Sequence, residues 1–140
     1  MHIKSFETAG IEAKRFSKSG ERVASLRVDQ NSSIIQIVRG PEDTASIDFR
    51  FTANYVGMGF IKIEGQMVVS GEVDVLIDEW KRDKMNPDDA NLVHNAIVSN
   101  CIPTALLISR DIKLPPPFPL PRINVQRKVE SKPGNGVEVA

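Results

Sequence analysis

Residues able to act as nucleophiles, bases or metal ligands are few in this 140-residue chain. The two histidines are His2, near the N-terminus, and His94, beside an apolar stripe, and Cys101 is the single cysteine. Catalysis by such groups requires a nucleophile, a base and an orienting group in mutual reach, and these residues are scattered along the sequence. The pattern therefore predicts a protein without enzymatic activity.

The same residues argue against a metal ion or a cofactor. One cysteine can form neither an intramolecular disulfide nor a cysteine-rich metal site. Of the neighbouring carboxylates Asp83, Asp88 and Asp89, the last two are expected in the first turn of a helix, where negative charge complements the helix dipole. No Walker, Rossmann or nucleophile-elbow motif is present, since Gly57-Met58-Gly59 continues without a third glycine. We predict no cofactor and no metal ion.

The net charge of the chain indicates which classes of macromolecule are expected as partners. Lysine plus arginine and aspartate plus glutamate number 18 each, so the formal net charge is zero. This balance favours neither nucleic acid nor an anionic membrane as a partner, and it does not oppose self-association. The first ten residues lack the apolar stretch of a signal peptide, and no apolar run approaches the roughly 18 residues of a membrane span. The expected location is the cytoplasm, without membrane insertion.

Alternating apolar and polar residues predict two adjacent β-strands. Apolar side chains occupy every second position between residues 47 and 55, and a second alternating run covers residues 61–69. Val56-Gly57-Met58-Gly59 lies between the runs, and a short glycine-containing turn between alternating segments is typical of an antiparallel hairpin.

Two further strands are predicted upstream. Residues 11–14 and 24–28 alternate on either side of a turn at residues 19–21. The apolar run 34–38 follows a polar cluster at residues 29–33, which breaks the alternation and indicates a bulge. Gly40-Pro41 ends this run with a strong turn signal. The sequence thus predicts four antiparallel strands in a meander.

Residues 73–80 fit two patterns. An apolar stripe at i, i+3, i+4 and i+7 is typical of a helix and consists of Val73, Leu76, Ile77 and Trp80. Val73, Val75 and Ile77 also alternate as they would in a strand. We favour a short helix or an ordered crossover, in which Asp78 and Arg82 can pair.

A long helix is predicted from residue 87 to about residue 109. Asn86 fits the N-cap and Pro87 the first helical position. The buried stripe is expected to contain Ala90, Val93, Ile97 and Cys101, extended by Leu106 or Ile108. Pro103 has no N–H, so we expect the helix to kink or restart there. The resulting fold class is α+β, with this helix packed on one face of the sheet.

The C-terminal part of the chain is rich in proline. Residues 114–121 contain five prolines and are expected to be extended, near polyproline II. Residues 126–140 are polar and contain glycine and proline, a composition typical of a disordered tail. We therefore predict a flexible fringe over residues 1–9, one domain over residues 10–125 and a tail over residues 126–140.

This order of elements resembles the protein-export chaperone family SecB. Three stretches carry the resemblance: SLRVDQNSSI at residues 25–34, residues 46–57, and NCIPTALLISR at residues 100–110 followed by Leu114 and PLPRINV at residues 119–125. The resemblance implies a four-stranded antiparallel sheet with helices on one face, a homotetramer built as a dimer of dimers, and no cofactor. It also implies ATP-independent binding of unfolded preproteins for export.

Two features of the family are missing from the sequence. The family continues with a second helix beside its peptide groove, whereas residues 126–140 show no apolar stripe. The family binds the translocation motor SecA through an acidic sheet surface and a metal-binding tail, whereas this chain has Lys62 beside Glu64 and a tail without Cys or His. The resemblance therefore implies client binding and argues against SecA as a partner.

Apolar surface residues are the candidates for client binding. Trp80 and Phe118 are plausible anchors, because large aromatic side chains dominate interface energies. The predicted peptide-binding set is Val73, Leu76, Ile77, Trp80, Phe118 and Leu120. These residues could instead close the core over the sheet. An alternative function is that of an oligomeric adaptor or toxin–antitoxin-associated regulator, which would bind one folded partner instead of many unfolded ones.

Overall fold

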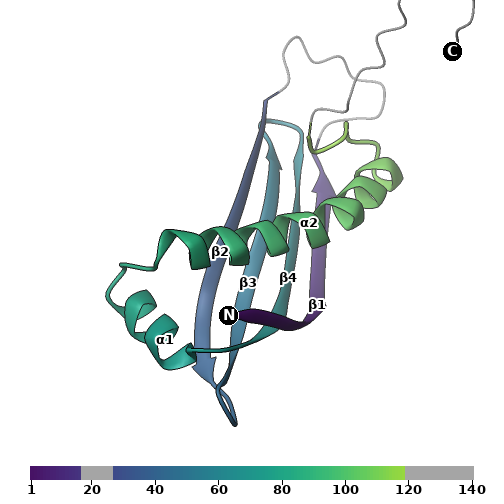
Figure 1. Ribbon diagram of the computed structural model, residues 1–140. Coiled ribbons are helices and arrows are strands. Elements are labelled where there is room, and N and C mark those ends of the chain that lie inside the picture. Colours follow the sequence, from purple (N-terminus) through teal and green to yellow (C-terminus); the bar gives the residue numbers. More distant parts are fainter. Residues whose placement is uncertain (17–26, 119–140) are drawn as a thin grey trace, which may run out of the picture.

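Four strands precede two helices in the computed structural model, which describes residues 1–16 and 27–118. The elements are β1 (His2–Arg15), β2 (Val28–Arg39), β3 (Thr44–Tyr55), β4 (Gly59–Ser70), α1 (Val73–Lys81) and α2 (Pro87–Asp111). The strands form one antiparallel sheet in the order β1-β4-β3-β2, and α2 lies across one face of it (Figure 1). This confirms the predicted α+β class with four antiparallel strands and one long helix.

The β3–β4 hairpin forms where alternation predicted it. Every second residue of β3 from Ala45 to Tyr55 is buried, and Ile61, Ile63, Met67 and Val69 of β4 face the same way. Gly57 has a φ of 77°, in the left-handed region that glycine adopts without strain. The Met58 N–H donates to the Tyr55 carbonyl at 2.8 Å and closes the turn.

The strand order corrects the meander. Only β2, β3 and β4 follow one another in space; β1 pairs with β4, from His2 opposite Ser70 to Arg15 opposite Gly59. Residues 2–9 are therefore part of a sheet strand and not a fringe outside the domain. Alternation shows which face of a strand is buried but not which strand lies beside it, so the sequence pattern left the position of β1 open.

The polar cluster at residues 29–33 lies inside β2 and does not interrupt it. The register shift occurs a little later, between Ile34 and Gln36. Polar side chains are accommodated because β2 is an edge strand whose side chains meet polar partners, such as His94 on α2. The predicted turn at residues 19–21 and the strand residues up to Leu26 lie outside the described residues.

The short helix α1 is capped from a distant loop. Its N-cap residue Glu72 has a φ of 54° and makes no side-chain capping bond. Instead, the Asp43 carboxylate in the β2–β3 loop accepts the N–H of Glu72 at 2.9 Å and of Val73 at 3.1 Å. The predicted pair between Asp78 and Arg82 is present at 3.3 Å. Residues 73–80 are thus helical, as favoured from the stripe.

Helix α2 begins as predicted and is continuous through Pro103. The Asn86 side chain accepts the Asp88 N–H at 2.8 Å, and Pro87 occupies the first turn. The buried stripe is Val93, Ile97, Cys101, Ala105 and Ser109, so it continues through Ala105 and Ser109 in place of Leu106 or Ile108. The helix does not break and restart at Pro103.

By length and composition α2 would be able to cross a membrane. One 18-residue window has a mean hydropathy of 1.4, which corrects the expectation that no segment approaches a membrane span. Here the helix packs on the sheet and 28% of that window is buried. A core helix of a globular protein meets the same criterion, so the finding does not identify a membrane protein.

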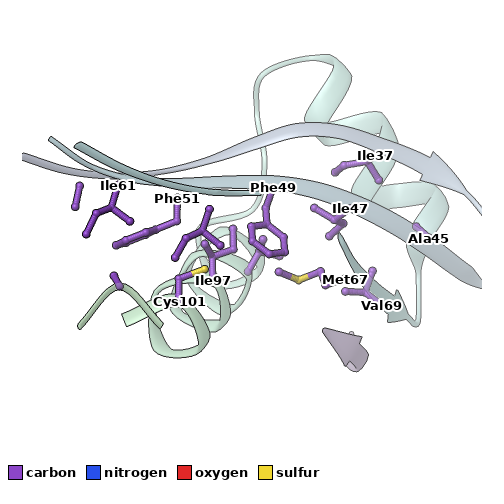
Figure 2. Packing of buried hydrophobic residues seen from close by; sticks show 14 of the residues in the cluster. Ile37, Ala45, Ile47, Phe49, Phe51, Ile61, Met67, Val69, Ile97 and Cys101 are labelled. Carbon is purple, nitrogen blue, oxygen red and sulfur yellow. The ribbon is translucent and has the colours of Figure 1, made fainter. Parts of the chain in front are cut away.

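The core lies between α2 and the sheet. Side chains of β3 and β4 meet Ile97 and Cys101 of the helix (Figure 2). Phe49 stacks on Phe6 of β1 with ring centroids 4.6 Å apart. Since α2 covers one face only, the polar side chains of the opposite face remain at the surface.

Candidate functional site

The chain reverses direction sharply after α2. The C-cap residue Ile112 donates its N–H to the Ile108 carbonyl at 3.0 Å. Lys113 has a φ of 61°, and the Leu114 N–H donates to the Ser109 carbonyl at 2.8 Å. A left-handed residue followed by a bond back into the last turn is a common helix ending. It directs the following prolines back alongside the helix.

The proline segment is fixed to the sheet through its carbonyls. The Tyr55 hydroxyl donates to the Pro115 carbonyl at 2.6 Å, and Gln30 Nε2 donates to the Pro117 carbonyl at 2.5 Å. Leu114 is 5% exposed and belongs to the core. Because proline restricts φ and has no N–H, a segment of this kind is stiff and needs partners only for its acceptors. The segment therefore forms a rigid wall beside α2.

An apolar groove of about 450 Å³ lies between this wall and the last turns of α2. Its lining consists of Leu106, Leu107, Ser109, Arg110, Leu114 and Pro116. We refer to these residues as the candidate groove. Leu107 is 55% exposed, whereas the Ser109 hydroxyl is buried and donates to the Leu106 carbonyl at 2.7 Å. The volume lies within the range of about 300–1,000 Å³ that is usual for ligand sites.

The lining of the groove is mostly uncharged. Arg110 is the only charged residue in the lining, and its guanidinium lies 3.3 Å from the Asp111 carboxylate at the exposed end of the helix. Burial raises the pKa of Tyr55 to about 12 and that of Cys101 to about 11, so both groups are uncharged near neutral pH. The site can bury apolar groups but has no charged pair suited to acid–base chemistry.

The structure removes two residues from the predicted peptide-binding set. Val73 is 0% and Leu76 is 2% exposed, and both belong to the core. They hold α1 against the sheet and offer no surface to a ligand. Ile77 and Trp80 pack partly against the core and keep some exposure. The alternative that these residues close the core is therefore correct for Val73 and Leu76.

Trp80 and Phe118 are not brought together. Helix α1 is capped by Asp43, just before β3 begins at Thr44, whereas the proline segment bonds to Tyr55 at the other end of β3. Because β3 has 12 residues with a rise of about 3.3 Å each, these two attachment points lie roughly 36 Å apart along the strand. Figure 1 shows α1 and the end of α2 at opposite ends of the sheet. Leu120 lies outside the described residues.

Of the residues that line the groove, only Leu106 was considered from the sequence, as a possible extension of the buried stripe, and the others were not named as candidates. Leu106 and Leu107 are consecutive, and neighbouring helical positions point about 100° apart, so both cannot face the sheet. This pair was the available signal of apolar surface.

Two observations bear on the chemistry considered from the sequence. Ser32 Oγ and His94 Nδ1 are hydrogen-bonded at 2.6 Å, which ties α2 to β2. In residues 1–16 and 27–118, no group of three or more His, Cys, Asp or Glu side chains is arranged to hold a metal ion.

Comparisons with known proteins place no further constraint on this site. No protein-family model, curated protein or solved structure matches the chain. The likeness to SecB thus stays a prediction that rests on the order of elements and on the three sequence stretches given above.

Proposed function

We propose that this protein is an ATP-independent holdase that binds non-native polypeptide in the candidate groove. The proposal includes a cytoplasmic location and a homo-oligomeric state, with protein export as the process suggested by the resemblance to SecB. The observation that carries it is the groove itself: an open apolar surface between a long helix and a proline-stiffened segment.

The chemistry of the groove favours an apolar segment of an unfolded chain as its ligand. Burying one large apolar side chain contributes about 1.5–3 kcal/mol, without requiring a particular sequence. Because the segment after Leu114 is already stiff and bonded to β2 and β3, little entropy is lost when the groove is filled. Such binding is broad in specificity and moderate in affinity, as holding many clients requires.

A second hollow, on the opposite sheet face, is a weaker candidate. It has a volume of about 370 Å³, and its lining includes Glu7, Asp48, Glu64 and Gln66. Three carboxylates in this lining oppose burial of apolar side chains, because covering a charged group removes its hydration. Apolar clients therefore favour the candidate groove.

The test is suppression of aggregation of an unrelated, chemically denatured protein, measured by light scattering. Pro116→Asp places a carboxylate in the candidate groove and is expected to reduce protection at least about fivefold, which corresponds to about 1 kcal/mol of lost binding. Pro41→Asp is the matched control, because Pro41 lies in the exposed β2–β3 loop at the other end of the sheet.

Equal protection by parent, Pro116→Asp and Pro41→Asp would exclude the groove as the client site. A parent that suppresses no aggregation, while one folded protein co-purifies with it, would replace the holdase with the adaptor.

A further inference from the structure

Positive charge gathers at the C-terminal end of α2, beside the candidate groove. Arg110 belongs to the groove lining, and its side chain is 74% exposed. Arg15 of β1 donates from Nε to the Ile112 carbonyl at 2.8 Å, which brings a second guanidinium to the helix end, and Lys113 is exposed there. The helix dipole accounts for cations at this end. It does not account for a guanidinium in the lining of an apolar groove.

The ion pair of Arg110 is an exposed one. Arg110 and Asp111 are neighbours in sequence, their charged atoms lie 3.3 Å apart, and their side chains are 74% and 66% exposed. Such pairs contribute little to stability, because water screens both charges. A carboxylate that enters the groove can therefore replace Asp111 as the partner of Arg110. Apolar groups buried beside the new pair exclude water and strengthen the attraction.

The hollow on the opposite sheet face has the opposite charge. Its lining contains Glu7, Asp48 and Glu64, of which Glu64 pairs with Arg50 at 2.9 Å. In a chain of zero net charge, the two hollows thus differ in sign. A segment that carries a carboxylate is attracted to Arg110 and repelled from the acidic hollow, whereas a basic segment has the reverse preference. Charge complementarity therefore favours an anionic partner for the candidate groove.

The positions of the apolar and cationic groups in the lining define a spacing. Leu106 and Arg110 are four residues apart on α2, which corresponds to about 6 Å along the helix axis. In an extended polypeptide, side chains on the same side are two residues and about 6.6 Å apart. An extended segment with an apolar side chain on Leu106 therefore places the side chain two positions away beside Arg110.

We propose that the candidate groove prefers non-native segments in which a large apolar residue and a carboxylate are two positions apart. Apolar burial supplies most of the binding, and the guanidinium of Arg110 adds a charge-assisted contact that distinguishes one apolar segment from another. This inference rests on the proposed function, because it names the class of client that the same groove binds best.

Fluorescence anisotropy with labelled peptides of about ten residues tests the preference. The peptides share two leucines at alternate positions and hold Glu, Gln or Lys two positions after the second leucine. At low salt the parent is expected to bind the Glu peptide at least about threefold more tightly than the Gln peptide, and the Lys peptide least tightly. High salt should reduce this ratio by screening. A peptide with Glu moved by one position should lose the advantage, because that side chain faces the other way.

Variants of Arg110 test the origin of the preference. Arg110→Gln is expected to make the Glu and Gln peptides bind alike, and Arg110→Glu to favour the Lys peptide. Arg82→Gln is the matched control, because Arg82 forms a similarly exposed pair with Asp78 at 3.3 Å at the end of α1. This control should keep the ratio of the parent. Since the ratio compares two peptides on one protein, a change in helix stability affects both peptides equally.

Failure of the preference and failure of the holdase give different results. Equal binding of the Glu, Gln and Lys peptides by a parent that suppresses aggregation overturns the preference and keeps the holdase. A preference for the Glu peptide that persists in Arg110→Gln overturns the role of Arg110. A parent that binds none of the peptides overturns the preference, and if it also suppresses no aggregation, the holdase is overturned with it.

Discussion

Asp43 connects the β2–β3 loop to the start of α1. Its carboxylate accepts two backbone N–H groups at the N-terminus of the helix, where negative charge is favoured by the helix dipole. The N–H groups of Val73 and Glu72 lower the pKa of this carboxyl below its ordinary value of 3.8. Since Glu72 makes no capping bond of its own, Asp43 carries this task alone among the described residues.

Asp43→Ala is therefore expected to lower the denaturant midpoint at neutral pH. Because the pKa of Asp43 is lower in the folded protein than in the unfolded chain, the unfolded chain binds a proton first as the pH falls. The stabilisation by Asp43 is therefore complete above pH 3.8 and disappears as the pH falls through the lower pKa of the folded protein. Urea unfolding at pH 7 and at pH 3 measures this. The midpoints of parent and variant should converge at the lower pH, and a constant gap would contradict the assignment.

Tyr55 controls the position of the proline segment and gives a second pH signature. Tyr55→Phe leaves the Pro115 carbonyl without its donor and is expected to cost about 1–2 kcal/mol of unfolding free energy. Burial raises the pKa of Tyr55 from 10.0 to about 12, so folding disfavours its ionisation. The stability linked to this hydroxyl is complete below pH 10.0 and is lost as the pH rises toward 12.

Tyr55 is the only tyrosine, so phenolate absorbance reports on this residue alone. The absorbance should rise together with unfolding in alkali. Cys101, whose pKa is raised from 9.0 to about 11, adds an alkaline loss of stability that parent and Tyr55→Phe share. Phenolate formation near pH 10 in the folded protein would contradict the buried hydrogen bond.

At the scale of elements, the pairing of β1 with β4 depends on a glycine. A β-carbon at Gly65 would overlap the Glu7 carbonyl oxygen and lie 2.7 Å from the Phe49 ring. Gly65→Ala is thus expected to destabilise the fold by about 1–3 kcal/mol, because either β1 or the Phe49 ring must move. Thermal unfolding measures the change.

Gly10 provides the matched control. It lies in β1 at the register shift opposite this region, and a β-carbon there meets nothing within 4 Å. Gly10→Ala should leave the melting temperature close to that of the parent. If both substitutions cost the same, general loss of glycine flexibility would explain them, and the close contact between β1 and β4 would not.

Helices and strands could be predicted where the residues that determine them lie close together in the sequence. The start of α2 rests on Asn86 and Pro87, whose effect is confined to one turn, and the β3–β4 hairpin rests on alternation across one short turn. The partner of β1 and the continuity of β2 depend on neighbours distant in sequence. No local pattern encodes them, and the corresponding predictions were wrong in these details.

At the scale of the whole molecule, the candidate site depends on the ends of the sheet. The apolar character of Trp80 and Phe118 could be predicted from the sequence. Their separation depends on the length and direction of β3, which places α1 and the proline segment at opposite ends of the strand, so the two residues do not line one groove. Burial of Val73 and Leu76 was the alternative left open, because an apolar stripe on a short helix fits core and ligand contact equally.

The distance between the two ends also affects how binding is observed. Trp80 is the only tryptophan and belongs to α1, which lies at the end of the sheet opposite the end of α2 (Figure 1). Its fluorescence is therefore insensitive to a client bound beside Pro116, and light scattering is the appropriate measurement.

The place of β1 at the far side of β4 bears on the order of folding. Arg15 pairs with Gly59 and His2 with Ser70, so the first strand to be synthesised pairs with the last one. The β2–β3 and β3–β4 hairpins close short loops, whereas docking of β1 closes a long one at a higher entropic cost and raises the contact order. We expect β2, β3 and β4 to form the folding nucleus and β1 to join afterwards, so that substitutions in β1 change the unfolding rate more than the folding rate.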